Sequence, residues 1–187
     1  MDTITTTSPP ADALSVVHFW RDAGPTMWFA KDADFDRRFR ERFHSEHEAA
    51  ARQELIGWLA TAEGALALVL LLDQYPRNAF RDTPRMYATD ELARQVADAA
   101  VAAGHDRAMP DDLAVFFYLP FGHSEMLSHQ ERCVALAARL GDPHPARAQH
   151  HCNIVRRFGR FPHRNALLSR VTTAEEQRYL DEGGYKG

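Results

Sequence analysis

The chain has 187 residues, of which 45% are hydrophobic, and its 22 basic and 26 acidic side chains give a formal net charge of −4. This length suits one domain with its own core, and the acidic excess argues against binding nucleic acid over the whole surface. The longest apolar run, 65–72, is far shorter than the roughly 20 residues that a membrane-spanning helix needs. We therefore expect neither nucleic acid nor a membrane as a partner.

The first ten residues and the cysteines bear on cellular location. Residues 1–10 carry no basic run and no apolar stretch, so we expect a disordered lead-in and not a secretory signal. Cys133 and Cys152 show no CxxC spacing and are expected to be core residues. A reduced, cytoplasmic protein is the resulting prediction.

Helical patterns separated by glycine, proline and capping residues fill residues 11–187, which we expect to form a single helical domain. In chain order, helices are predicted at 11–21, from 32 or 34 onward, at 55–59, at 62–75, from 89 or 90 to 103, from 110 to 119, at 133–140, from 143 or 145 to 158, from about 162 and from about 173. Phe35, Phe39 and Phe43 fall four apart and mark the buried face of the second segment.

Several local details can also be predicted. The segment 62–75 is apolar nearly all round and hence central. Pro76 disfavours helical geometry at Tyr75, so this helix is expected to end or kink there. Capping boxes are predicted in two places, where a serine or threonine precedes a glutamate by three residues. These pairs are Ser128 with Glu131 and Thr172 with Glu175.

The fold class follows from these patterns. No stretch alternates between apolar and polar residues with β-branched enrichment, so we expect roughly nine helices and no sheet. Short loops favour stacked antiparallel hairpins. No clean repeat near 34 residues recurs, so any repeat architecture must be degenerate.

The stretch Arg156–Asn165 suggests a place where an anion is held. It contains four arginines, a histidine and an asparagine, and Gly159 and Pro162 prevent one smooth helix through it. Arginine presents a planar fork of donors that suits carboxylate and phosphate. The alternative is a rigid corner in which the arginines pair with carbonyls and with carboxylates such as Asp73 and Glu125.

Two further pieces carry polar residues beside apolar segments. Asp73 and Arg77, spaced i, i+4 at the end of the central helix, either form a structural ion pair or line a cavity. His123 and Glu125 follow a Pro-Phe-Gly turn and can approach one substrate or metal from a loop, where the histidine would move protons. The alternative is that Ser124 and Glu125 cap the next helix while His123 bonds a carbonyl.

The remaining histidines leave several interpretations open. His151 projects toward the apolar side of its helix, where a histidine is usually a core residue, yet it lies close in sequence to the arginine stretch. Because His150 precedes it, the sequence does not show whether His150 or His151 faces a site. His44 and His47 look like part of a solvated helix face. No P-loop, GxGxxG or HExxH motif is present, and we expect no cofactor and no bound metal, a zinc or di-iron site being only weakly supported.

Three motifs together resemble the bacterial family called domain of unknown function 924. They are the sequences at 71–78, 118–125 and 157–165, and His18-Phe19-Trp20 and Gln130-Glu131-Arg132 also fit. The resemblance extends from about Leu14 to the end of the chain. It implies an all-helical, right-handed array similar to tetratricopeptide-repeat proteins and no established activity. The departures are the extra His150 and Gly122, which stands where other members carry a larger residue.

Two functions are compatible with this sequence. The first is one polar pocket that binds a small anionic metabolite, with acid–base chemistry by His123, Glu125 and His163. The residues expected to bind that ligand are Asp73, Arg77, His151, Arg157, Arg160, Arg164 and Asn165. The alternative is a non-catalytic helical-repeat scaffold that receives acidic peptides or protein partners. Because the unusual residues are concentrated in three short pieces, we favour the pocket. The sequence indicates no oligomeric state.

Overall fold

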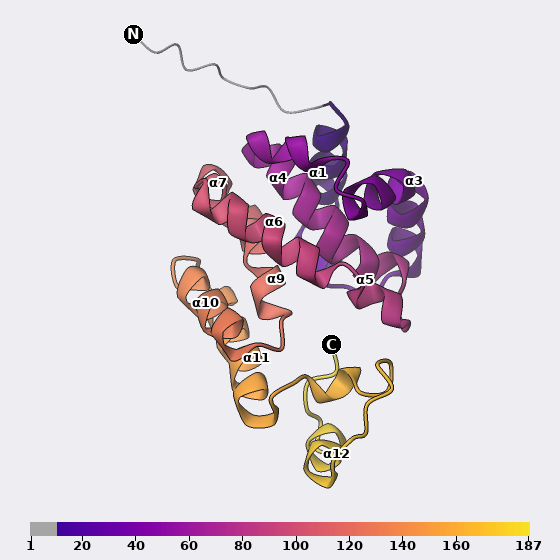
Figure 1. Cartoon of the computed structure of the whole chain (residues 1–187), viewed down its shortest axis with the longest axis vertical. Coiled ribbons are helices and arrows are strands. Elements are labelled where there is room, and N and C mark those ends of the chain that lie inside the picture. Colours follow the sequence, from indigo (N-terminus) through magenta and orange to yellow (C-terminus); the bar gives the residue numbers. More distant parts are fainter. Residues whose placement is uncertain (1–10) are drawn as a thin grey trace. The chain divides into compact units, whose positions relative to one another are not determined.

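The computed structural model describes residues 11–187, which form helices without a strand (Figure 1). The all-α fold predicted from the sequence is confirmed, and the lead-in 1–10 lies outside the described residues. The chain divides into two compact units, one comprising 11–81 and 85–120 and the other 82–84 and 121–187. Each unit is described by itself below. The expected single domain and the tetratricopeptide-repeat-like array stay predictions.

The N-terminal unit contains most of the helical segments. Its α-helices are α1 (Ala11–Ala23), α2 (Pro25–Trp28), α3 (Ala33–Ala51), α4 (Ala62–Val69), α5 (Tyr75–Ala79), α6 (Asp90–Ala102), α7 (His105–Ala108) and α8 (Asp111–Ala114). Between them lie the 3-10 segments Ile56–Ala60, Pro84–Tyr87 and Val115–Phe117 and the π-helical segment Leu70–Gln74. The described chain has more segments than the roughly nine expected because several of them are a single turn.

Helix α4 is the centre of the N-terminal unit, as its apolar sequence predicted. It packs against α1 and α6, and residues 64–69 are all buried. The three phenylalanines predicted to mark one face of α3 are buried as well. Trp20 joins them from α1 and contacts the ring of Phe116 edge-on at 5.3 Å. These rings pack together with the buried aliphatic residues of α4, such as Leu66 and Leu68.

Pro76 does not end the central helix, because Tyr75 before it keeps helical φ and ψ of −53° and −49°, contrary to the geometry expected there. The chain widens into the π-helical segment Leu70–Gln74, and the N–H of Tyr75 donates to the carbonyl of Leu70. Pro76 then occupies the first turn of α5, where its missing N–H costs nothing. The widened turn therefore absorbs the proline and places Asp73 and Arg77 on one continuous helical path.

His47 corrects the expectation of a solvated histidine face. Its side chain is buried, and Nδ1 lies 2.9 Å from the carbonyl oxygen of Leu71. The imidazole stacks on Tyr75 with ring centroids 4.5 Å apart, whereas His44 is exposed. The interpretation was wrong for His47 because the helix pattern alone does not show which neighbour a polar side chain will meet.

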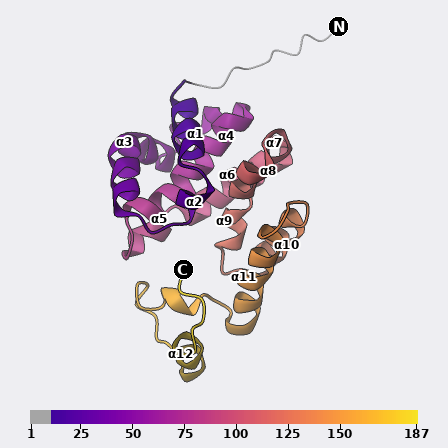
Figure 2. The same cartoon turned by 180° about the vertical axis from the view of Figure 1, so that it is seen from behind.

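The C-terminal unit is built on a helix pair. Helix α9 (Leu119–Gly122) leads into it, and α10 (Leu127–Ala137) packs against α11 (His144–Phe158), as Figures 1 and 2 show in orange. A 3-10 turn, Pro162–Arg164, and helix α12 (Ala174–Asp181) complete the unit. Its core contains Ile154, Val155 and Phe161, and the two cysteines, on α10 and α11, are buried as expected.

Both predicted capping boxes are misplaced. Helix α10 begins after Met126, so Ser128 lies inside its first turn, and Ser124 Oγ accepts the Met126 N–H at 3.2 Å instead. The final helix is capped by Thr173 with Glu176, one residue later than Thr172 with Glu175. Each shift occurs because tertiary partners fix the register, as the site below shows for Glu176. Within 11–187, no helix is both long and apolar enough to cross a bilayer.

Candidate functional site

The predicted site residues are divided between the two units. Asp73 and Arg77 belong to the N-terminal unit, where Arg77 Nη1 lies 3.2 Å from Asp73 Oδ1 and 2.8 Å from Asp90 Oδ1. Burial lowers the pKa of Arg77, but the charges of Asp73 and Asp90 outweigh it and raise that pKa. The geometry is that of a structural ion pair joining α5 to α6. A ligand-binding role for these two residues stays a prediction.

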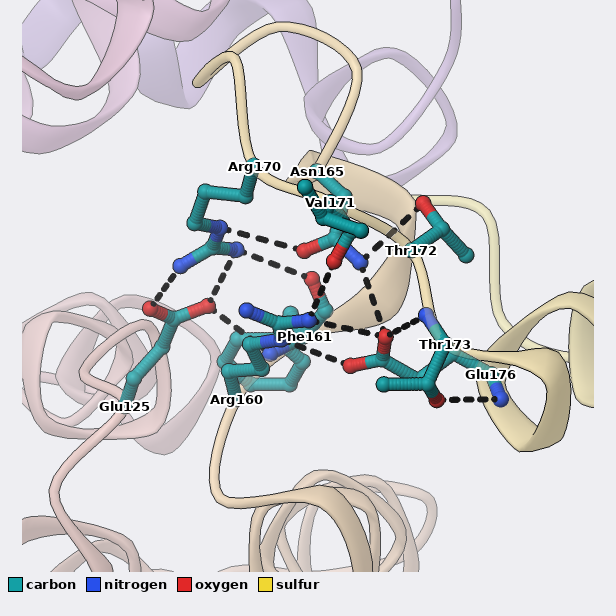
Figure 3. Close-up of polar contacts among 9 residues, drawn as sticks. All are labelled: Glu125, Arg160, Phe161, Asn165, Arg170, Val171, Thr172, Thr173 and Glu176. Atoms are coloured by element: carbon teal, nitrogen blue, oxygen red, sulfur yellow. Dashed lines mark hydrogen bonds and ion pairs between the residues drawn. The ribbon is translucent and has the colours of Figure 1, made fainter.

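All the other predicted residues lie in the C-terminal unit, where Glu125 is committed to an ion pair. Arg170 donates to both of its carboxylate oxygens, at 2.6 and 2.9 Å, and the Phe161 N–H donates to Glu125 Oε1 at 2.8 Å (Figure 3). Burial raises the pKa of Glu125, but these hydrogen bonds bring it below its usual value. Glu125 is thus an ionised anchor for the turn around Phe161.

A second ion pair links the bend to helix α12. Arg160 donates to the two carboxylate oxygens of Glu176, at 2.6 and 2.8 Å, and to the Val171 carbonyl at 2.7 Å. The Asn165 side-chain amide donates to Glu176 at 3.2 Å. The Arg160 hydrogen bonds lower the pKa of Glu176, which is only 3% exposed, to about 2. Figure 3 shows Arg160 and Arg170 each directed at a carboxylate.

Arginines of the stretch are paired with carboxylates, as in the rigid-corner alternative, but the partner of Arg160 is Glu176 and not Asp73 or Glu125. Glu125 pairs with Arg170, outside the stretch, and accepts the Phe161 N–H within it. Arg157 pairs with Glu175 at 2.9 Å, and both side chains are more than half exposed. Arg157 and Arg160 are thus each paired with a carboxylate, and a ligand-binding role for them stays a prediction.

The imidazoles of the unit gather beside this corner in what we call the histidine cluster: His123, His151 and His163 with the rings of Phe161 and Tyr185. The ring centroids of His151 and His163 lie 4.7 and 5.1 Å from that of Tyr185, and each lies 5.6 Å from that of Phe161. His123 acts electrostatically on both. Three separate chain segments thus bring their histidines together.

The same contacts show which of the adjacent histidines faces the cluster. His151 is partly buried and contacts both Phe161 and Tyr185. His150 is exposed and contacts Tyr185 from its edge, at 5.9 Å. The inward residue is therefore His151.

Both inner imidazoles are held in their neutral form. Burial, assisted by the charge of His123, lowers the pKa of His151 to about 3. Burial, assisted by the charge of Arg164, lowers the pKa of His163 to about 4. His163 Nδ1 is also buried without a hydrogen-bond partner among the described residues. A buried polar atom of this kind calls for an explanation, since nearly all such atoms are paired in native proteins.

The backbone beside His123 is held by a buried glutamine. Gln130 is 0% exposed, and its amide donates to the carbonyls of Gly122 and Ser124, at 2.7 and 2.6 Å. A Cβ on Gly122 would lie 3.0 Å from Cys133 Sγ, so this chain has little room for a larger residue there. These contacts fix the turn that presents His123.

Comparisons with known proteins agree with the motifs. The family model described as "Bacterial protein of unknown function (DUF924)" matches residues 16–184. The chain belongs to this family. It is similar to a solved structure titled "Structure of Protein of Unknown Function ATU0120 from Agrobacterium tumefaciens", with 57% sequence identity, a TM-score of 0.91, and coverage of 92% of this chain and 98% of that chain. No curated protein matches it.

The DUF924 motifs do not include every residue that builds the site. Arg170, Glu176 and Tyr185 were not expected to take part. A signal existed for Glu176, which stands three residues after Thr173, and for Tyr185, which follows two glycines. Arg170 lies in an irregular segment where no spacing indicates a partner. Within 11–187, no three His, Cys, Asp or Glu side chains are arranged to hold a metal ion.

Proposed function

We propose that this DUF924 protein binds a small anionic metabolite at the histidine cluster and that His163 exchanges a proton with it. The observation that carries the proposal is the buried Nδ1 of His163, which has no partner among the described residues. A ligand O–H directed at this atom, or an anionic oxygen that accepts from it when Nδ1 carries the ring proton, would satisfy it. The neighbouring neutral imidazole of His151 offers a second site for a hydrogen bond.

The charges around His163 favour an anion. Arg164 and Arg170 both lower its pKa, and Glu125 is the carboxylate that opposes them. Arg170 is itself paired with Glu125, so Arg164 is the guanidinium with the largest effect on His163, in a partly buried place where charge interactions are stronger than in water. Of the arginines expected to bind ligand, Arg164 is the one whose guanidinium lies by the cluster, 4.6 Å from the centre of the Phe161 ring.

The same charges suggest how proton transfer would be coupled to binding. Without ligand, His163 is deprotonated at neutral pH and is able to accept a proton. An anion beside the ring raises the imidazole pKa toward neutrality, where general acid–base catalysis is most effective. His123 and His151 complete the polar surface, and Glu125 acts through Arg170 as a positioning residue.

Binding is testable without knowing the substrate. The histidine ring resonances of the full chain would be followed by NMR while acetate, inorganic phosphate or benzoate is added. We expect at least one of these anions to shift the resonances of His151 and His163, and His163→Gln to weaken its binding about tenfold, the effect of losing one good interaction. His18→Gln, which changes an exposed histidine of α1, is the matched control.

Two results would overturn the proposal. One is that none of the anions shifts the cluster resonances. The other is that an anion binds His163→Gln, shown by circular dichroism to be folded, as tightly as it binds the unmodified protein. His163 would then be a packed core histidine.

A further inference from the structure

Tyr185 occupies the middle of the histidine cluster. Its ring is surrounded by aromatic neighbours, with centroids at 4.7 Å for His151, 5.1 Å for His163, 5.9 Å for His150 and 6.4 Å for Phe161. The contacts with His150 and His163 are edge-on, at 80 and 86°. The Tyr185 ring therefore packs on this surface through edge and tilted contacts, which aromatic pairs prefer to a face-to-face arrangement.

The backbone that carries Tyr185 is held by glycines. Gly183 has a positive φ of 87°, and a Cβ on Gly184 would lie 2.5 Å from the carbonyl oxygen of Tyr179 and 2.6 Å from its ring. The N–H of Tyr185 then donates to the Tyr179 hydroxyl at 2.9 Å. The chain thus approaches α12 so closely at residue 184 that only glycine fits, and this approach sets where the Tyr185 ring lies.

Tyr185 is not locked into the core in the way the other large rings are. Its side chain is only partly buried, and Lys186 after it is exposed, whereas Gly187 lies against His163, since a Cβ there would be 3.2 Å from the imidazole. By contrast, Phe161 beneath it is 1% exposed. A ring at the rim of a cluster, on a segment with two successive glycines, is able to leave while the surface beneath it stays in place.

We infer that Tyr185 is an internal occupant of the ligand site and that the ligand is an aryl carboxylate, whose ring replaces that of Tyr185. This inference rests on the proposed function and names its ligand class. The ligand ring would take over the contacts with His151, His163 and Phe161. Its carboxylate would lie toward Arg164, whose guanidinium is 4.6 Å from the centre of the Phe161 ring, and a polar ring substituent would reach His163 Nδ1.

The variant Gly184→Ala is designed to displace the Tyr185 ring from the histidine cluster. The added methyl group would collide with the carbonyl oxygen and ring of Tyr179, so we expect the backbone that carries Tyr185 to shift. Gly141→Ala is the matched control, since a Cβ there meets nothing within 4 Å. We expect benzoate to bind the unmodified protein about tenfold more tightly than acetate does. Gly184→Ala should strengthen benzoate binding about fivefold further and leave acetate binding unchanged.

A second measurement, made without any ligand, reports how well Tyr185 shields His151 and His163 from solvent. Diethyl pyrocarbonate modifies neutral, accessible imidazoles, and peptide mass spectrometry locates the modified histidines. We expect His151 and His163 to react several-fold faster in Gly184→Ala than in the unmodified protein or Gly141→Ala. Tyr185→Ala should give the same acceleration, which keeps the test decisive if Gly184→Ala does not fold.

The outcomes separate this inference from the proposed function. Unchanged modification rates in both variants would show that Tyr185 is not a removable occupant. Faster modification combined with equal binding of benzoate and acetate would eliminate the aryl ligand but leave an anion site. If no anion shifts the cluster resonances in any variant, the proposed function falls, and the ligand class falls with it.

Discussion

Glu176 holds several parts of the C-terminal unit at once. Its carboxylate accepts from Arg160, from the Asn165 amide and from the backbone N–H of Thr173. Its neighbour Glu175, by contrast, makes a surface ion pair with Arg157. Two adjacent glutamates therefore differ in environment while sharing a helix turn, which makes them a matched pair for measuring what the buried network contributes.

We expect Glu176→Gln to lower the free energy of unfolding by about 2 kcal/mol, the scale of losing charge-assisted hydrogen bonds. Glu175→Gln should change it by no more than about 0.5 kcal/mol, because exposed ion pairs contribute little. Urea denaturation followed by circular dichroism measures both. Equal effects would mean that the Arg160–Glu176 pair is no more important than a surface contact.

The same pair of variants gives a pH signature. The pKa of Glu176 is about 2 in the folded state and roughly 4.3 in an unfolded chain. A depressed carboxyl pKa stabilises the fold above the unfolded value, and this contribution is lost as the pH falls toward the folded value. The gap in stability between the unmodified protein and Glu176→Gln should thus narrow between about pH 4.3 and 2.

At the scale of elements, helix α4 approaches the preceding 3-10 segment closely at Gly64. A Cβ on Gly64 would overlap the carbonyl oxygen of Trp58 and would also meet the capping hydroxyl of Thr61. Gly57, within that 3-10 segment, has open space around it. One glycine is therefore required by packing and the other is not.

Gly64→Ala should destabilise the protein by about 2 kcal/mol, because overpacking outweighs the roughly 1 kcal/mol by which alanine favours a helix. Gly57→Ala should stay within about 0.5 kcal/mol of the unmodified protein. Thermal and urea unfolding compare the two. A stabilised Gly64→Ala variant would show that the contact with Trp58 relaxes without cost.

The positions of the helices could be predicted from the sequence more accurately than their caps and local helix type. The ends of α6 and α11 were expected within about two residues, since glycine and proline mark them locally. The π-helical segment Leu70–Gln74 was not expected, because a widened turn leaves the apolar pattern unchanged. The cap at Thr173 was misplaced by one residue, because its register depends on Arg160, which no local rule takes into account.

The site was predicted less completely than the fold, and for a related reason. The spacing of unusual residues indicated that His123 and the 157–165 stretch would share a site, and both lie in the C-terminal unit. Which arginines would be neutralised depends on Glu125 and Glu176 meeting them across the fold. Pairing of that kind leaves no periodic trace in one sequence, so the sequence alone could not show that Arg160 is paired with Glu176.

For the whole molecule, the tryptophans provide a way to watch the two units separately. Trp20, Trp28 and Trp58 are the three in the sequence, and all belong to the N-terminal unit, whereas both units contain helices. Each unit also has buried apolar residues of its own. Tryptophan fluorescence thus reports on one unit, and circular dichroism reports on both.

We expect Glu176→Gln to lower the unfolding midpoint measured by circular dichroism while leaving the tryptophan midpoint unchanged, since each compact unit is expected to unfold on its own core. Gly64→Ala should lower the tryptophan midpoint. Thermal melts recorded with both probes on the same samples provide the comparison. If every variant shifts the fluorescence and circular dichroism midpoints equally, the two units unfold in one cooperative transition.

The ion pair between Arg160 and Glu176 also limits which substitutions the protein can tolerate during evolution. A change at position 176 alone would remove the partner of Arg160, one hydrogen-bond acceptor of Asn165 and the side-chain half of the capping box of α12 together. A single substitution of either charged residue is therefore disfavoured, and replacements that preserve the fold would have to change both residues. We therefore expect homologues either to keep both residues or to have replaced both, so that positions 160 and 176 covary.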